Sequence, residues 1–324
     1  MLPMQFLISS ATLFSASCDR MLRKNELNFL QVDAFTDTRF GGNPAIVVLD
    51  ADSLDDEQMY MIAEEMSSRE TVFVCKSSVA DFCFRFLTSK GEIDFSGHSA
   101  IAAFHALVEE GKAEVVYDVT MLSLETKSGV LQVEIVKNET TRTHEVQITH
   151  SRPEFMNTYD TKAYAEALGL NLVDIMSLYP IQTVSTGTPH LVIPLMSLDA
   201  LERVKPNLDL IESLSADGDY DSIIAFTKET HEVTSDAHLK HFAPALGVAE
   251  EPASGVASGC LGSYLIRHGI IDSTNRVSTI VLEQGYHLGR PSKVIVEVIG
   301  DREGIEQVKV SGTAVTVMKG EIYI

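Results

Sequence analysis

Two residues in the first half of the chain have the features that proton-transfer chemistry needs. Glu70 stands directly before an apolar run at 71–74, and His98 follows a serine and a glycine at the start of a long uncharged stretch. A carboxylate beside a buried cleft can have a raised pKa, which lets it alternate as base and acid near neutral pH. The positive end of a helix dipole favours a neutral histidine, which can donate or accept a hydrogen bond. Glu70 is therefore compatible with proton transfer, and His98 with a hydrogen bond to a substrate.

Both residues also have a plain structural interpretation. Glu70 follows Arg69 and is compatible with an exposed carboxylate in a surface salt bridge. His98 is compatible with a hydrogen-bonded structural histidine, and His105, seven residues later, is expected to pack in the core. Four further histidines show no spacing typical of a metal site: His190, His231, His238 and His241.

The stretch IDFSGHSAIAAFHALVEEG at 93–111 has a polar start followed by an apolar run. This pattern predicts a helix that is buried on all sides and begins at residue 96 or 97. The first turn of a helix offers unpaired backbone N–H groups, and Gly97 lets a ligand approach them closely. Ser96 also fits a simple N-cap. We expect a small carboxylate-bearing molecule to bind between this helix start and a second one at Gly255.

The same pattern occurs a second time, as EEPASGVASGCLGSYLIRHGII at 250–271. One offset of 158 residues pairs Ser96, Gly97, Leu107, Gly111, Leu124 and Glu125 with Ser254, Gly255, Leu265, Gly269, Leu282 and Glu283, and also Phe84 with Phe242. A drifting offset relates 43–49 to 188–194 and 131–136 to 293–298. We infer a duplicated domain, with two central helices whose N-termini face a shared cleft.

Short β-branched runs precede and follow each central helix, which predicts strands. Strands around a helix that is apolar on every side imply a sheet rolled about that helix, so the expected fold class is α+β with two pseudo-symmetric barrel-and-helix domains. An amphipathic helix is expected on the outside at 55–66. The expected boundaries are an N-terminal extension at 1–25, a first domain at 26–150, and a second at 151–324 whose last strands can cross back.

Five motifs in fixed order resemble the PhzF-like isomerase family of phenazine biosynthesis: VDAFTDTRFGGNPAIVV, RETVFV, FRFLTSKGEIDFSGHSAIAAF, FAPALGVAEEPASGVASGCLGSYL and EQGYHLGRPS. The resemblance extends from about residue 28 to the C-terminus. It implies a diaminopimelate epimerase-like fold, with two barrels that each surround a helix and an active site between them. It also implies that Glu70, in RETVFV, is the acid/base that moves a proton across one face of the substrate.

The chain departs from this family at two positions of the second helix start that normally contact substrate. Glu251 replaces an aspartate and Val256 replaces a serine, which implies a substrate other than the family's best-known dihydro-hydroxyanthranilate. The catalytic residues implied by the resemblance are Glu70, His98 and Glu251. The implied substrate-binding residues are Asn43, Gly97, Ser99, Ser254, Gly255 and Val256. Arg290, in GRPS, is a candidate partner for a carboxylate.

The related epimerases carry two thiols, one at each helix start, where this chain has Ser96 and Ser254. A serine hydroxyl is not acidic enough to replace a thiol as an unaided base. The residue types therefore disfavour two-thiol racemisation.

Composition narrows the partners and the compartment. A formal net charge of −21 argues against nucleic acid or an anionic membrane as a partner, but not against a small anionic metabolite. Four irregularly spaced cysteines favour a reducing, cytoplasmic location, and no phosphate loop or dinucleotide motif predicts a cofactor. The expected function is that of a cofactor-free isomerase, and a homodimer is compatible with the sequence. The alternative is a small-molecule binding or regulatory protein that keeps the cleft but does not turn over a substrate.

Overall fold

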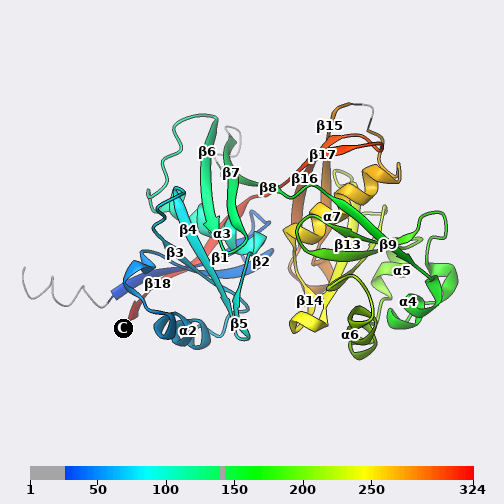
Figure 1. Ribbon diagram of the computed structural model, residues 1–324, viewed down its shortest axis with the longest axis horizontal. Helices are drawn as coiled ribbons and strands as arrows, with labels where there is room; N and C mark the ends of the chain where they lie inside the picture. The colour runs from blue at the N-terminus through cyan, green and yellow to red at the C-terminus, as the bar shows by residue number, and fades with distance from the viewer. Residues whose placement is uncertain (1–25, 139–142, 274) are drawn as a thin grey trace, which may run out of the picture.

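The computed structural model describes residues 26–138, 143–273 and 275–324, so the predicted extension at 1–25 lies outside the described residues. Figure 1 shows two lobes side by side, each a curved sheet around one central helix. This arrangement confirms the α+β fold class expected from the sequence.

Lobe 1 surrounds α3 (Gly97–Glu109). Its strands are β1 (Glu26–Ala34), β2 (Asn43–Val48), β3 (Thr71–Cys75), β4 (Phe82–Thr88), β5 (Gly91–Ile93), β6 (Val119–Thr126), β7 (Gly129–Asn138), β8 (Thr143–His150) and β18 (Ala314–Tyr323). The C-terminal strand β18 pairs antiparallel with β1, so the end of the chain returns to the first lobe.

Lobe 2 surrounds α7 (Gly255–Arg267). Its strands are β9 (Glu154–Tyr159), β10 (Ile181–Ser185), β11 (Pro189–Pro194), β12 (Ser222–Thr227), β13 (Ala237–Ala243), β14 (Val248–Glu251), β15 (Val277–Gln284), β16 (Ser292–Gly300) and β17 (Ile305–Gly312). The two lobes repeat one topology, because the parallel pairs β2–β3 and β4–β6 recur as β11–β12 and β13–β15. The antiparallel pair β8–β17 joins the two sheets.

The central helices are buried because their side chains are small or apolar on every face. Alanines fill much of α3, and every residue from His98 to Phe104 is at most 6% exposed. Glycines do the same in α7, where a Cβ on Gly262 would lie 2.7 Å from Cγ1 of Val296. Close approach of β16 to the helix therefore depends on that glycine.

The remaining helices lie on the outer faces of the sheets (Figure 1). They are α2 (Asp56–Glu65) on lobe 1, and α4 (Thr161–Ala167), α5 (Leu198–Glu202) and α6 (Leu208–Ala216) on lobe 2; short 3₁₀ turns occupy Ala51–Ser53, Leu172–Asp174, Pro244–Leu246 and Tyr286–Leu288. The predicted amphipathic helix is α2, which starts at a capping box of Asp55 and Gln58 and buries Met59, Ile62 and Ala63. None of the described helices is long and apolar enough to cross a membrane.

The strand register corrects one pairing that was predicted from the sequence. The β4–β6 and β13–β15 pairs align on Leu124 and its equivalent Leu282, and this register makes Phe84 equivalent to Leu239 rather than to Phe242. Leu239 shares the inner core with Phe84, whereas Phe242 packs under the outer helices. The sequence offset and the strand register thus differ by three residues, because the loops of the two lobes have unequal lengths. An odd shift moves a side chain to the other face of a strand.

Candidate active site

The two central helices begin next to each other where the lobes meet. A Cβ added to Gly97 would lie 3.8 Å from the Cα of Gly255. Both helices start at the residues expected from the sequence, with Ser96 and Ser254 in the N-cap positions. The positive ends of both helix dipoles therefore point into one region, which favours a negatively charged group there.

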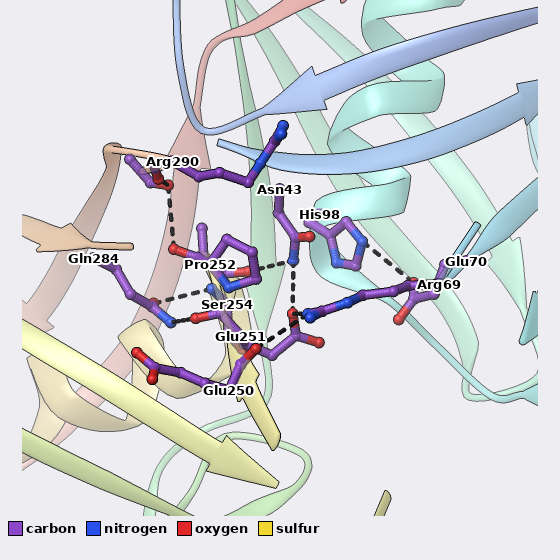
Figure 2. Close-up of polar contacts among 12 residues, drawn as sticks. Asn43, Arg69, Glu70, His98, Glu250, Glu251, Pro252, Ser254, Gln284 and Arg290 are labelled. Atoms are coloured by element: carbon purple, nitrogen blue, oxygen red, sulfur yellow. Dashed lines mark hydrogen bonds and ion pairs between the residues drawn. The ribbon is translucent and has the colours of Figure 1, made fainter. Parts of the chain in front are cut away.

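Glu70 lies just before β3 and directs its carboxylate at the start of α3. Ser99 Oγ donates a hydrogen bond to Glu70 Oε2 at 2.7 Å, and His98 Nε2 lies 3.6 Å from the same oxygen, as Figure 2 shows for the histidine. The Glu70 and His98 side chains are only 14% and 7% exposed. Glu70 therefore faces the helix start and is not paired with its neighbour Arg69 on the surface.

The two serine N-caps differ in what their hydroxyls do. Ser254 Oγ accepts a hydrogen bond from the Ala257 N–H at 3.3 Å and so caps α7. Ser96 makes no such cap, and its Oγ instead lies 3.3 Å from Nδ1 of His98. Within the described ranges, no atom accepts a hydrogen bond from the backbone N–H of Gly97 or His98. The start of α3 thus keeps two N–H donors available for a ligand.

Glu251 ends β14 and reaches across from lobe 2 to lobe 1 (Figure 2). Its Oε2 accepts hydrogen bonds from Asn43 Nδ2 at 3.1 Å and from an Arg69 guanidinium nitrogen at 3.2 Å. Asn43 Nδ2 also donates to the Ala253 carbonyl at 2.7 Å. The other amide atom, Asn43 Oδ1, is buried and accepts no hydrogen bond from the part of the chain that is described. Asn43 therefore joins the lobes and still offers one free acceptor.

Burial and neighbouring charge act on the acidic residues of β14. Burial raises the pKa of Glu251, and the charge of Glu70 acts in the same direction, whereas the charges of His98 and Arg69 oppose the rise. Burial also raises the pKa of Glu250 to about 7. A raised pKa means that a carboxyl keeps its proton to a higher pH than usual, and at Glu251 the Arg69 guanidinium acts against this effect of burial.

Two residues of this site were not among those expected from the sequence. Arg69 donates both to Glu251 and to the Glu250 carbonyl, at 3.1 Å for the latter. Gln284 is fully buried; its Oε1 accepts from the Ser254 N–H at 3.1 Å and its Nε2 donates to the Glu251 carbonyl at 2.7 Å. Gln284 directly follows the paired position Glu283, so the duplication was a signal that pointed to it.

Other expected residues lie at the edge of the site or outside it. Arg290 pairs with the carboxylate of Asp33 at 2.7 Å, which ties the loop before β16 to lobe 1. Val256, the second residue of α7, is partly exposed. His105 is not packed in the core as expected: its side chain is 21% exposed and its Nε2 lies 3.4 Å from a carboxylate oxygen of Glu109. The described residues contain no group of three or more side chains that could hold a metal ion.

Comparison with known proteins settles the family. The family model described as phenazine biosynthesis-like protein, PhzC-PhzF, matches residues 32–320. The chain belongs to this PhzF family. Among its relatives is an uncharacterised isomerase of Clostridium acetobutylicum, 34% identical over 94% of this chain and 100% of that protein. Another is the trans-2,3-dihydro-3-hydroxyanthranilate isomerase of Pseudomonas fluorescens, 30% identical over 92% and 99% of the two chains.

Solved structures agree with this membership. A PhzF-family protein of Bacillus anthracis has a TM-score of 0.85 at 33% identity and covers 92% of this chain and 99% of its own. A hydroxyproline epimerase of Agrobacterium vitis has a TM-score of 0.63 at 11% identity, over 92% and 91% of the chains, which shows a shared fold alone. This PhzF-family chain is therefore an isomerase with the epimerase-like fold that its sequence pattern implies.

Proposed function

We propose that this isomerase shifts a proton on a small carboxylate-bearing substrate without a bound cofactor, and that Glu70 removes and returns that proton. The observation that carries the proposal is the position of the Glu70 carboxylate, at the start of α3 and within 3.6 Å of His98 Nε2. Ser99 fixes the orientation of the carboxylate by donating to one of its oxygens. The second oxygen is then directed to the space in which a substrate would lie.

The start of α3 supplies the complementary binding chemistry. In our proposal the substrate carboxylate binds the free N–H groups of Gly97 and His98. As Glu70 takes a proton from an adjacent carbon, negative charge grows on the substrate, and the same N–H groups and the helix dipole stabilise it. Glu251 and Asn43 Oδ1 lie opposite and bind a hydrogen-bonding group of the substrate. Glu70 then returns the proton to another carbon on the same face.

Deuterium incorporation tests this function. The protein is incubated in D2O with a panel of small unsaturated and hydroxylated carboxylic acids that includes trans-2,3-dihydro-3-hydroxyanthranilate, the compound in the relative's name. We expect carbon-bound deuterium for one class of acid. Glu70→Gln keeps the shape but cannot carry a proton, so the exchange rate should fall by ~10²–10⁴-fold. The matched control is Glu64→Gln, an exposed glutamate on α2.

Equal exchange by the wild type and Glu70→Gln would show that another residue carries the proton. Binding of an acid without exchange by fresh wild-type protein would instead support the alternative of a binding protein without turnover. That alternative is favoured by one feature, the engagement of the Glu251 carboxylate by both Asn43 and Arg69.

A further inference from the structure

Uncharged polar side chains gather inside lobe 2, behind the start of α7. We call this group the lobe 2 polar cluster; its members are Thr186, His190, Ser222, His241 and Cys260, each at most 4% exposed. Cys260 Sγ lies 3.6 Å from Thr186 Oγ1 and 3.8 Å from His190 Nδ1. The rings of His190 and His241 lie 5.2 Å apart. The contacts make one continuous group.

Two ring nitrogens of the cluster have no hydrogen-bond partner among the described residues. His190 Nδ1 lies 2.8 Å from the Thr188 carbonyl, which can only accept, so Nδ1 carries the proton and Nε2 is an acceptor. No hydrogen bond to that Nε2 comes from residues 26–138, 143–273 or 275–324. His241 Nε2 pairs with Ser222 Oγ at 2.9 Å, and His241 Nδ1 is buried with no partner in the same ranges. Buried polar atoms are normally hydrogen-bonded, so the buried Nδ1 of His241 calls for an explanation.

Lobe 1 shows that the fold does not require polar residues at these positions. In the two parallel strand pairs, Leu191 lies opposite Ile223 and Ile46 lies opposite Thr71. Because the strand register makes Thr71 equivalent to Ile223, Ile46 is equivalent to Leu191, and the preceding residue Ala45 is equivalent to His190. The strand register likewise makes Phe86 equivalent to His241, and the helix offset makes Ala102 equivalent to Cys260. The three lobe 1 residues are at most 1% exposed. Apolar side chains in lobe 1 therefore occupy the positions that imidazole and thiol side chains occupy in lobe 2.

The cluster also lies where the catalytic carboxylate lies in the other lobe. By the same register Thr71 is equivalent to Ile223, so Ser222 occupies the place of Glu70. Cys260 follows Val256 by four residues and therefore shares its face of α7, one turn deeper than the helix start. Thr186 Oγ1 lies 3.3 Å from Nδ1 of His150, whose ring contacts Phe95 of lobe 1. The cluster thus extends from the junction of the lobes into lobe 2.

Every titratable member of the cluster is uncharged at neutral pH. Burial lowers the pKa of His190 to about 4 and lowers that of His241 well below its usual range, with the charge of His190 acting in the same direction on His241. Burial raises the pKa of the Cys260 thiol to about 12. Neutral imidazoles and hydroxyls bind a neutral donor such as a hydroxyl group, and the low polarity around them disfavours a charged group.

We propose that the lobe 2 polar cluster selects the substrate, by accepting a hydrogen bond from a hydroxyl group that lies remote from the substrate's carboxylate. The free acceptor is Nε2 of His190. Nδ1 of His241 accepts as well when His241 Nε2 donates its proton to Ser222 Oγ. The proposal rests on the proposed function, because it places the carboxylate at the start of α3. It assigns specificity to residues that take no part in moving the proton.

Matched ligand pairs test this selection. Anthranilate and benzoate are compared by calorimetry with 3-hydroxyanthranilate and 3-hydroxybenzoate at pH 7.5. We expect the wild type to bind at least one hydroxylated acid about 10–100-fold more tightly than its parent, the range typical of one buried hydrogen bond. The double variant His190→Ala, His241→Phe carries the lobe 1 residues at both positions. It should bind both members of the pair equally and leave the affinity for the parent acid unchanged.

Further variants separate selection from folding and from catalysis. Cys260→Ala alters the cluster least and serves if the double variant does not fold; it should lower the preference without abolishing it. His105→Ala, in lobe 1 and outside the cluster, should keep the wild-type ratio. Glu70→Gln should keep the wild-type ratio of affinities for the hydroxylated and the parent acid but lose deuterium exchange. The binding test therefore stays valid even if the proposed proton transfer is wrong. A wild-type preference below threefold for both pairs, or a folded cluster variant with the full wild-type preference, would overturn the proposal.

Discussion

Acid should destabilise the protein through the buried histidines, and His190→Ala should remove a defined part of that effect. His190 is 4% exposed and burial lowers its pKa from an ordinary value of 6.5 to about 4. The unfolded chain therefore binds a proton near pH 6.5, whereas the folded chain does not until near pH 4. Stability from this group is present above pH 6.5 and is lost as the pH falls through this window.

The size of the effect follows from the shift. At 1.36 kcal/mol per pKa unit, the full shift corresponds to about 3 kcal/mol, of which about 2 kcal/mol is already lost at pH 5. His190→Ala loses the hydrogen bond to the Thr188 carbonyl and some packing at every pH, so its free energy of unfolding starts lower. Its further loss between pH 7.5 and pH 5 should nevertheless be smaller than that of the wild type by about 2 kcal/mol.

Urea unfolding at pH 7.5 and pH 5 measures both losses for each protein. Cys260→Ala is the matched control, because it changes the same cluster but removes a thiol whose pKa of about 12 keeps it neutral at both pH values. It should lose as much stability between the two pH values as the wild type. Equal losses for wild type and His190→Ala would refute the reasoning, since they would mean that His190 takes up its proton as readily in the folded protein as in the unfolded chain.

Two other substitutions test how the lobes are built. Gly262→Ala should lower the free energy of unfolding by ~1–3 kcal/mol, because its Cβ would overlap Val296. Gly97→Ala is the control and should lower it less, because the nearest atom to its added Cβ lies 3.8 Å away. Equal effects of the two substitutions in urea unfolding would contradict this reasoning. Arg290→Met leaves the carboxylate of Asp33, 1% exposed, without its cation and should cost ~3–5 kcal/mol. Adding Asp33→Asn to Arg290→Met should restore most of the lost stability, because it removes the unpaired charge. A double variant as unstable as Arg290→Met would show that the unpaired Asp33 carboxylate is not the cause of the loss.

Local sequence patterns were enough to locate the two central helices, whereas the candidate acid/base Glu70 came from the family resemblance. A Ser-Gly start before an uncharged apolar run predicted a helix that begins at residue 96 or 97 and a second one at the equivalent Ser-Gly, and the helices begin at Gly97 and Gly255. Such patterns are readable because helix starts and burial depend on residues a few positions apart. The repeated pattern predicted the duplication, and the resemblance to the PhzF family implied the site residues that the structure gathers at the lobe junction.

Contacts between distant segments were decided only by the tertiary structure. The Asn43–Glu251 hydrogen bond joins residues 208 positions apart, and Arg69 meets the same carboxylate from a position whose side chain the sequence left unassigned. Neither pairing has a local signature, because it depends on how the two lobes are placed.

The sequence by itself determined which residues begin the helices, which runs become strands, and that one domain is repeated. It did not determine strand register across the repeat, where loops of unequal length make Phe84 equivalent to Leu239 and place His241 inside lobe 2. Register depends on pairing between strands far apart in the chain, and a shift of an odd number of residues exchanges the inner and outer faces of a strand. For that reason the sequence did not show that His190 and His241, two of the four histidines without metal-site spacing, lie next to each other as neutral side chains inside lobe 2.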